Sequence, residues 1–109
     1  MTLYSIIKYI FKDRTLFITG GFGETFKERI IIHRSIDNDY IGDEYKILEY
    51  ITAIKKGYAY SMIQQSLKTI EDRTVDILEV DFYIKDDSGE ERVENATIHF
   101  DITKCFGKE

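Results

Sequence analysis

The feature that most constrains this fold is a strict alternation of apolar and polar residues in two segments of the last third of the chain. Residues 75–85 and 95–103 both place apolar side chains at even-numbered positions. These positions are Leu78, Val80, Phe82 and Ile84 in the first segment, and Ala96, Ile98, Phe100 and Ile102 in the second. A period of two is that of a β-strand with one face buried. If the strands pair, paired residue numbers must sum to an even number, because otherwise one strand would turn its apolar face to water.

The loop between these two strands must therefore have an odd number of residues. Asp87-Ser88-Gly89 meets this requirement as a three-residue turn with Gly89 in the left-handed conformation. Such a turn places Lys85 opposite Glu91, where opposite charges favour the pairing. We therefore predict an antiparallel hairpin in this part of the chain.

Apolar residues spaced by three and four positions predict helices elsewhere. Residues 2–12 fit a helix with Thr2 as N-cap, although a strand paired with the next segment is an alternative reading. From Asp43 the pattern is again helical, with carboxylates in the first turn, and Gly57 is a natural stop. Residues 59–70 continue the helical pattern, so Gly57 is either a kink or a break between two helices. The apolar stripe of this last segment consists of Ile63, Leu67 and Ile70.

Two further segments, residues 15–19 and 29–36, are rich in β-branched side chains and predict strands. The predicted order is αββ-αα-ββ. This order corresponds to an α+β fold in which a four-stranded antiparallel sheet packs on helices. A chain of 109 residues, 43% of them hydrophobic, is long enough for one core, so we expect residues 1–109 to form a single domain.

The stretch ITGGFGETFKERIIIH, residues 18–33, places three of the seven glycines within four positions. A dinucleotide-binding loop needs a third glycine and a following helix, but Phe26 occupies that glycine position and a strand follows. A Walker loop needs Gly-Lys-Ser/Thr, and a kinase loop needs catalytic motifs, and neither is present. We therefore expect a flexible hairpin loop whose exposed Phe22 is available for contact with a partner.

Two groups of residues have features of metal or catalytic sites. Asp37-Asn38-Asp39 begins like a calcium loop, but Leu48 stands where the bidentate glutamate is required. On the polar face of the predicted hairpin, the allowed registers bring together Glu79, Asp81, His99 and Asp101. Carboxylates and an imidazole are suited to divalent metals or acid–base chemistry, but no pocket or nuclease motif accompanies them. We therefore expect no catalytic residue, no metal and no cofactor.

Acidic side chains are concentrated in the last third of the chain. There are 20 acidic and 15 basic residues, giving a net charge of −5, and half of the acidic residues lie within residues 71–94. A surface of this kind repels nucleic-acid phosphates and anionic membranes and attracts basic proteins. We therefore expect a basic protein as partner, with no direct binding to nucleic acid or to a membrane. The expected contacts are Asp37, Asp39, Asp43, Glu44, Glu79, Asp81, Asp86, Asp87, Glu90, Glu91 and Glu94, together with Phe22.

The composition favours the cytoplasm of a bacterial cell. An excess of isoleucine, lysine and tyrosine is typical of AT-rich bacterial or phage genomes. The single cysteine, Cys105, excludes an intramolecular disulfide and indicates a reducing compartment. The first apolar run, LYSIIKYIF, is too short to span a bilayer and lacks the features of a signal peptide.

Residues 1–58 contain five short segments in a fixed order. They are a predicted helix ending in KDRT, the predicted strands LFITGG and RIIIH, the acidic loop DNDYIGDE and a predicted helix ending in IKKGY. In this order, residues 1–58 resemble the small acidic phage anti-CRISPR proteins that occupy the DNA-binding site of a type II effector nuclease. The resemblance implies that the acidic side chains of residues 37–44 contact a basic, DNA-reading surface. The predicted hairpin at residues 75–103 departs from the pattern.

We therefore expect a non-enzymatic acidic protein-binding module, acting as an inhibitor or nucleic-acid mimic that blocks a basic surface, in the manner of an anti-CRISPR protein. Two alternatives stay open. One is a small metal- or nucleotide-dependent enzyme that uses the glycine loop or His99. The other is a toxin-immunity or self-assembling module, for which a homodimer is the simplest form.

Overall fold

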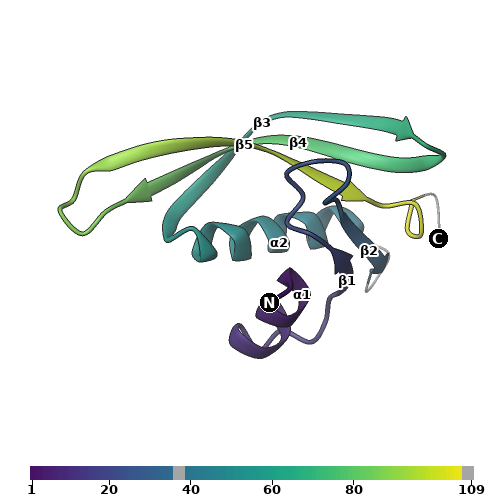
Figure 1. The fold of residues 1–109 in the computed structure, drawn as a ribbon, viewed down its shortest axis with the longest axis horizontal. Coiled ribbons are helices and arrows are strands. Elements are labelled where there is room, and N and C mark those ends of the chain that lie inside the picture. The colour runs from purple at the N-terminus through teal and green to yellow at the C-terminus, as the bar shows by residue number, and fades with distance from the viewer. Residues whose placement is uncertain (36–38, 107–109) are drawn as a thin grey trace.

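Helices cover one face of a mixed β-sheet in the computed structural model, which describes residues 1–35 and 39–106 (Figure 1). The helical elements are α1 (Leu3–Ser5), which continues into the π-helical segment η1 (Ile6–Ile10), and α2 (Tyr40–Ile54). The strands are β1 (Phe17–Gly20), β2 (Ile30–Arg34), β3 (Gly57–Ile70), β4 (Arg73–Lys85) and β5 (Glu91–Asp101). None of the helices in this part of the chain has the length and apolar character needed to cross a membrane.

Five strands of the described residues form one sheet in the order β1-β2-β5-β4-β3. Strands β2 and β5 run parallel, with Ile30 beside Phe100 and Ile31 beside Asp101, while the other neighbouring strands are antiparallel. The β3–β4 and β4–β5 hairpins extend past the helices in opposite directions, so the molecule is elongated, with extents of 46 × 29 × 23 Å (Figure 1).

The predicted C-terminal hairpin is confirmed, both in its register and in which side chains face the core. Lys85 lies opposite Glu91, and every paired number along β4 and β5 has the required even sum. Gly89 has a φ of +86°, which is the left-handed conformation expected for the turn. The even-numbered apolar residues predicted to face the core are buried in β4 and at the end of β5.

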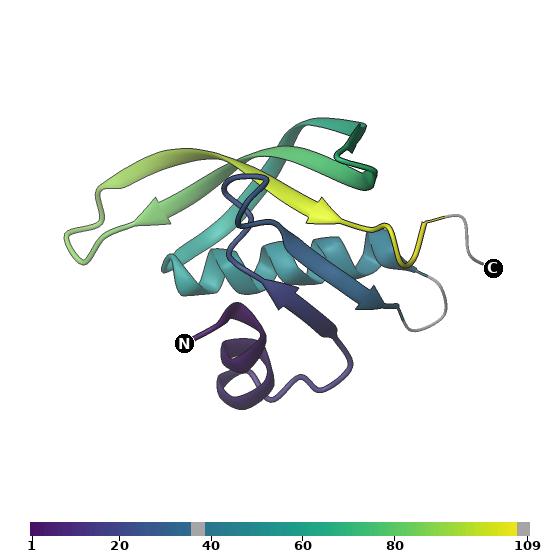
Figure 2. The same cartoon turned by 45° about the vertical axis from the view of Figure 1, so that its right-hand side comes forward.

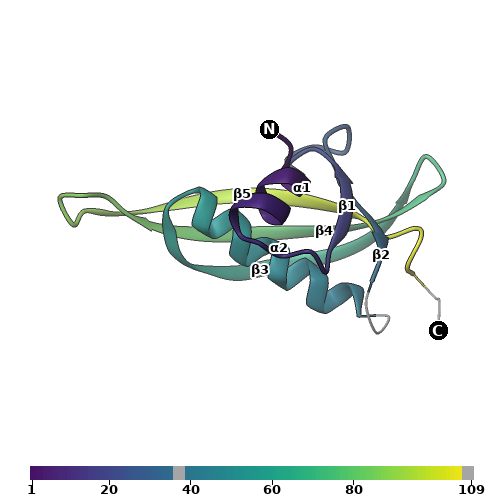
Figure 3. The same cartoon turned by 90° about the horizontal axis from the view of Figure 1, so that it is seen from below.

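The core lies between this face of the sheet and the helices (Figure 3). Leu3 and Ile7 from the N-terminal helical region and Ile47, Leu48 and Ile51 from α2 are buried there. Complete burial of one such side chain stabilises the fold by about 1.5–3 kcal/mol. The helix predicted within residues 2–12 is confirmed.

Both helices begin at side-chain caps. The Thr2 hydroxyl accepts a hydrogen bond from the Ser5 amide at 3.1 Å, as predicted for an N-cap. The second helix begins at Tyr40 rather than at Asp43, because the Asp39 carboxylate accepts a hydrogen bond from the Gly42 amide at 2.9 Å.

The helix predicted over residues 59–70 is wrong, because this segment is strand β3. Its residues pair with β4 from Gly57 to Ile70, with register shifts at Tyr58 and at Ile63. The predicted apolar stripe does not share one face of the strand: Ile63 is the bulged residue, Leu67 lies opposite Asp76, and Ile70 lies opposite Arg73. The extra residue of the bulge interrupts the period of two by which the strand could have been recognised.

The predicted sheet is also corrected. It has five strands within the described residues, not four, and it is mixed rather than antiparallel. The extra strand is β3, and the parallel pair arises because α2, β3 and β4 intervene between β2 and β5 and return the chain in the direction of β2. The prediction of an α+β fold is confirmed.

The glycine-rich loop between β1 and β2 packs against β5 (Figure 2). The Gly23 carbonyl accepts hydrogen bonds from the His99 amide at 2.6 Å and from His99 Nδ1 at 2.9 Å. Since a carbonyl can only accept, Nδ1 of His99 carries the proton. The loop is therefore attached to the sheet at Gly23, which corrects the prediction of a flexible turn, whereas Phe22 beside it is exposed, as expected.

We expect Gly23→Ala to lower the free energy of unfolding by about 2–3 kcal/mol. Gly23 has a φ of +86°, and a Cβ there would lie 2.8 Å from Cγ2 of Ile98. The matched control is Gly89→Ala, where φ is also +86° but the nearest atom outside the turn is 3.9 Å away, so we expect a loss of about 1 kcal/mol. Urea denaturation measures both variants, and equal losses would show that loop packing contributes nothing.

Candidate functional site

The candidate site is the face of β3, β4 and β5 opposite the helices (Figure 2), which we call the open face. No helix of the described residues covers it. Its residues are the odd-numbered ones in the middle of β4 (77–83) and of β5 (93–97), together with the β3 residues that lie opposite Ile77, Glu79 and Asp81. They are Ser61, Gln64, Ser66, Ile77, Glu79, Asp81, Tyr83, Val93, Asn95 and Thr97.

Two predicted contact residues, Glu79 and Asp81, lie next to each other along β4 on the open face. Asn95, on β5, donates its amide hydrogens to both: Nδ2 lies 3.1 Å from Oε2 of Glu79 and 2.8 Å from Oδ1 of Asp81. Neither carboxylate forms an ion pair with another described residue. The open face therefore presents two negative charges that are held together by one amide nitrogen.

Beside Glu79 the open face has a shallow depression of about 170 Å³. It is lined by Gln64, Ser66, Ile77, Glu79 and Thr97. Its floor is mixed, with one apolar side chain, one carboxylate and several neutral hydrogen-bonding groups. This combination matches a long side chain with an apolar stem and a cationic end.

The predicted acidic residues Asp86, Asp87, Glu90 and Glu91 lie together at the exposed tip of the β4–β5 hairpin. Asp86 stabilises this turn through hydrogen bonds. Its Oδ1 accepts hydrogen bonds from the amide and hydroxyl of Ser88 and from the amide of Glu90, at 2.6–3.0 Å. These hydrogen bonds hold the pKa of Asp86 below its ordinary value.

Other predicted contact residues lie elsewhere. Glu94 turns toward the helix side, where it forms an ion pair of 2.7 Å with Lys55. Asp39 is the exposed cap of α2, and Asp43 is half-buried in its first turn, where burial raises the pKa of its carboxyl group. Asp37 lies outside the described residues. The acidic residues thus form one group on the open face, one at the hairpin tip and separate positions around α2.

The prediction that Glu44 is a surface contact residue is corrected, because its side chain is fully buried and does not reach the surface. It packs with its carboxyl group within hydrogen-bonding reach of Asp76 on β4. Asp76 also accepts a hydrogen bond of 2.7 Å from Nε2 of Gln65 on β3. Burial, followed by the hydrogen bond and charge of Asp76 and the charge of Asp43, raises the pKa of Glu44 to about 10. Glu44 is therefore protonated at neutral pH and donates its proton to Asp76.

The carboxylate and imidazole group considered as a catalytic or metal site is not assembled. His99 is bonded to Gly23, whereas Asp101 is buried between two arginines. Nε of Arg29 lies 2.9 Å and Nε of Arg73 lies 2.8 Å from the same oxygen of Asp101. No set of three or more His, Cys, Asp or Glu side chains among the described residues is placed to hold a metal ion.

A cationic corner lies beside Asp101, and it consists of Arg29, Arg73, Lys104 and His33. Nζ of Lys104 lies 2.8 Å from Nδ1 of His33, which must accept, so Nε2 carries the proton and donates it to the Thr19 hydroxyl at 2.6 Å. Burial and the nearby charges of Lys104 and Arg73 lower the pKa of His33. Positive charge is therefore gathered at this corner, outside the open face, whereas the open face is negative around Glu79.

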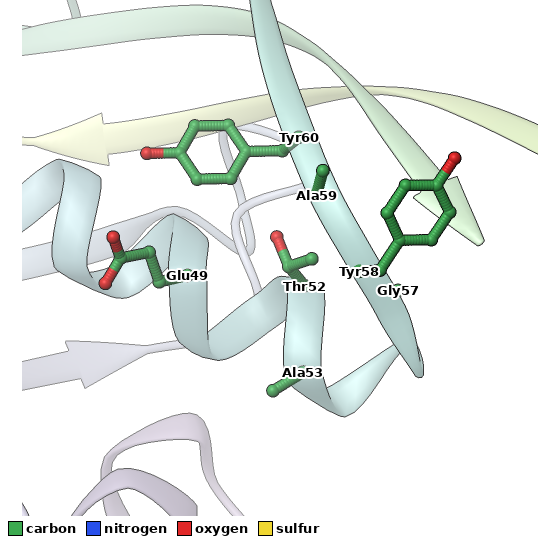
Figure 4. A pocket seen from close by; sticks show the side chains of 7 residues that line it. All are labelled: Glu49, Thr52, Ala53, Gly57, Tyr58, Ala59 and Tyr60. Carbon is green, nitrogen blue, oxygen red and sulfur yellow. The ribbon is translucent and has the colours of Figure 1, made fainter. Parts of the chain in front are cut away.

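A separate pocket of about 390 Å³ lies between the end of α2 and the start of β3 (Figure 4). Figure 4 shows the Tyr60 ring extending over the helix toward Glu49, while Tyr58 turns away on the other side of the strand. The Thr52 hydroxyl donates its proton to the Leu48 carbonyl at 2.7 Å. The pocket thus offers an aromatic wall and one carboxylate at the edge of the sheet.

Comparison with known proteins supplies no family for these surfaces. No family model, curated protein or solved structure matches the chain. The sequence pattern had located Glu79 and Asp81 on a polar strand face. It had missed the role of Asn95, which the register places opposite Asp81. It had also missed both arginines of Asp101, since no local signal links residues so far apart in the chain.

Proposed function

We propose that the protein is a non-enzymatic binding module whose open face blocks a basic surface of another protein. The observation that carries this proposal is the pair of carboxylates at Glu79 and Asp81. Both are on the uncovered face, both are held by Asn95, and neither is neutralised by a described cation. Carboxylates held without a counter-ion are suited to receive cationic groups from a partner.

The depression next to Glu79 supports a lysine or arginine as the central contact. The stem of such a side chain has Ile77 to pack against, and its charged end reaches the carboxylate of Glu79. The tip acids Asp87, Glu90 and Glu91 extend the negative surface along the same hairpin and favour rapid, salt-dependent association. The cationic corner at Arg29 and Arg73 fixes the orientation, since it repels the basic end of the partner.

The partner class that we propose is a nucleic-acid-binding effector, with the DNA-binding groove of a type II CRISPR nuclease as the first to test. Two neighbouring carboxylates, with the acidic hairpin tip beyond them, offer negative charge of the kind that such a groove attracts. The resemblance of residues 1–58 to anti-CRISPR proteins supports the same partner, although Glu44 is buried and cannot contribute. The surface we assign is therefore the open face rather than the loop before α2.

The test is inhibition of DNA binding and cleavage by purified type II effector nucleases, each loaded with guide RNA. We expect the wild-type protein to inhibit at least one nuclease and Glu79→Lys to weaken inhibition by about tenfold or more. The matched control is Glu49→Lys, which changes the net charge equally but lies on the exposed side of α2. It should leave inhibition within about threefold of the wild type.

Inhibition that is equally sensitive to both substitutions would mean that net charge alone acts and that the open face is not the site. Absence of inhibition of any type II nuclease would overturn the proposed partner class. Retention of the protein on a panel of other basic proteins, lost in Glu79→Lys and in about 0.5 M salt but kept in Glu49→Lys, would then support the broader binding function.

A further inference from the structure

Strand β3 forms an edge of the sheet along its whole length of 14 residues. It pairs with β4 on one side, and no strand of the described residues pairs with its other side. Natural edge strands are protected by charges, prolines, bulges or short length. Apart from its register shifts at Tyr58 and Ile63, this edge has little such protection: the chain has no proline, and from Gly57 to Leu67 there is no charged residue. Ile63 and Leu67 are each about half exposed on it.

We propose that a second copy of this chain occupies the edge, with β3 of each copy pairing antiparallel across a two-fold axis. Such an interface is isologous, so each residue meets its counterpart twice. Pairing of residues 59–68 of the two strands places Ala59 of one copy opposite Lys68 of the other, with the axis between Ile63 and Gln64. The two sheets then form one continuous sheet, with the helices of both copies on the same face.

The β-bulge at Ile63 makes this register self-consistent over residues 59–68, and a second register shift, between Gly57 and Ala59, ends the matched segment. Before the bulge, Tyr60 and Met62 face the helix side, whereas after it Gln65 and Leu67 do so. In this pairing, Tyr60 lies opposite Leu67 of the second copy, and Met62 lies opposite Gln65. Each pair faces the same side of the joined sheet, which without the one-residue shift of the bulge would be impossible for pairs of odd sum.

The same register places apolar surface against the pocket between α2 and β3. Leu67 of the second copy comes beside Tyr60, one of the residues that line this pocket (Figure 4). The side chain of Leu67, about half exposed in one chain, is thereby covered. Cross-strand pairs of an aromatic and an aliphatic residue are among the favourable ones in sheets.

Charges at both ends of the strand point to a second copy as the occupant. No acidic residue lies between Glu49 and Glu71 in the sequence, although the chain has 20 of them. This pairing brings Glu71, in the β3–β4 turn, toward Lys56 of the second copy, whereas Lys55 is held by its ion pair with Glu94. Because of the two-fold axis, this match of opposite charges occurs at both ends, and a neutral stretch fills the middle.

The experiment measures the oligomeric state of the full chain by sedimentation equilibrium. We expect a dimer for the wild type at about 10 μM. Leu67→Lys should raise the dissociation constant about tenfold or more, because it places a charge opposite Tyr60. The matched control is Val93→Lys, an equally exposed apolar residue on β5 away from the edge, which should leave the dissociation constant unchanged. Circular dichroism confirms that each variant is folded.

A charge exchange tests the register itself. Lys56→Glu and Glu71→Lys should each weaken the dimer about threefold to tenfold, and the double variant should restore wild-type association. A wild-type chain that stays monomeric at about 500 μM, or a double variant as weak as the two single changes combined, would overturn the proposal. Leu67 lies opposite Asp76 on the helix side of the sheet, whereas Glu79 is on the open face, so the two assays report on opposite sides of the sheet and their outcomes can be told apart.

Discussion

Replacing Asp101 with asparagine is expected to lower the free energy of unfolding by about 3–5 kcal/mol. Its carboxylate is fully buried and accepts hydrogen bonds from Arg29 and Arg73 and from the amide and hydroxyl of Thr103. These contacts join β2, the start of β4 and the end of β5. Removing the negative charge leaves two arginines close together without a counter-charge, which explains the size of the loss. Urea denaturation at neutral pH measures it.

Asp101 also makes the free energy of unfolding of the wild type depend on pH in the acidic range. Burial would raise the pKa of Asp101, but the hydrogen bonds from Arg73, Thr103 and Arg29 outweigh burial and hold it well below the ordinary 3.8. The folded state therefore binds this proton less readily than the unfolded state. The stabilisation is complete above about pH 5, and it is lost as the pH falls through the ordinary pKa and then through the lowered one. Asp101→Asn should lack this part of the acid transition.

The control for both measurements is Asp87→Asn at the exposed tip of the β4–β5 hairpin. We expect it to stay within about 0.5 kcal/mol of the wild type at neutral pH. If Asp101→Asn lost no more stability than Asp87→Asn, the two arginine contacts would have no net stabilising effect. An unchanged acid transition in Asp101→Asn would contradict the lowered pKa.

Glu44→Gln is expected to stabilise the protein at alkaline pH, by at least about 3 kcal/mol at pH 9. The pKa of Glu44 is raised to about 10 in the folded state, against 4.5 in its ordinary environment. Between these values the folded chain keeps a proton that the unfolded chain releases. Stability therefore falls as pH rises, by up to about 1.4 kcal/mol per pH unit. Glutamine donates a hydrogen bond to Asp76 as protonated Glu44 does, but it has no proton to lose.

The measurement is the free energy of unfolding from about pH 5 to pH 9, with Glu49→Gln on the exposed side of the same helix as the control. The groups around Glu44 are Tyr40 and Asp43 on α2, and Asp76 and Gln65 on the sheet. Burial and the nearby carboxylates raise the pKa of Tyr40, so it stays neutral in this range. A slope equally steep in Glu44→Gln would assign the pH dependence to another group.

The part of the fold that the sequence predicts best is the β4–β5 hairpin. There the alternation, the odd loop and Gly89 all require one register, and the structure has that register. Strand β3 could not be recognised in this way. Its bulge at Ile63 interrupts the period of two, so its pairing with β4 is decided by tertiary contacts rather than by local pattern.

In the candidate site too, positions set by local sequence pattern could be predicted, whereas positions set by contacts between distant segments could not. Glu79 and Asp81 were predictable on the polar face because strand alternation alone puts them there. The burial of Glu44 was not predictable, because a carboxylate in the first turn of a helix is ordinarily favoured by the helix dipole and exposed. Asp76, which explains its burial, is brought to it by the packing of α2 on β4, and no spacing in the sequence encodes that contact.

The parallel contact of β2 with β5 has a consequence for biosynthesis. Ile30 finds its neighbour only when Phe100 has been made, and the loop closed by this contact contains most of the chain. Closing so long a loop is slow compared with forming the two C-terminal hairpins, which are local. A nascent chain should thus leave its first two strands without this contact until residue 100 has been synthesised, and during that interval their exposed edges favour aggregation.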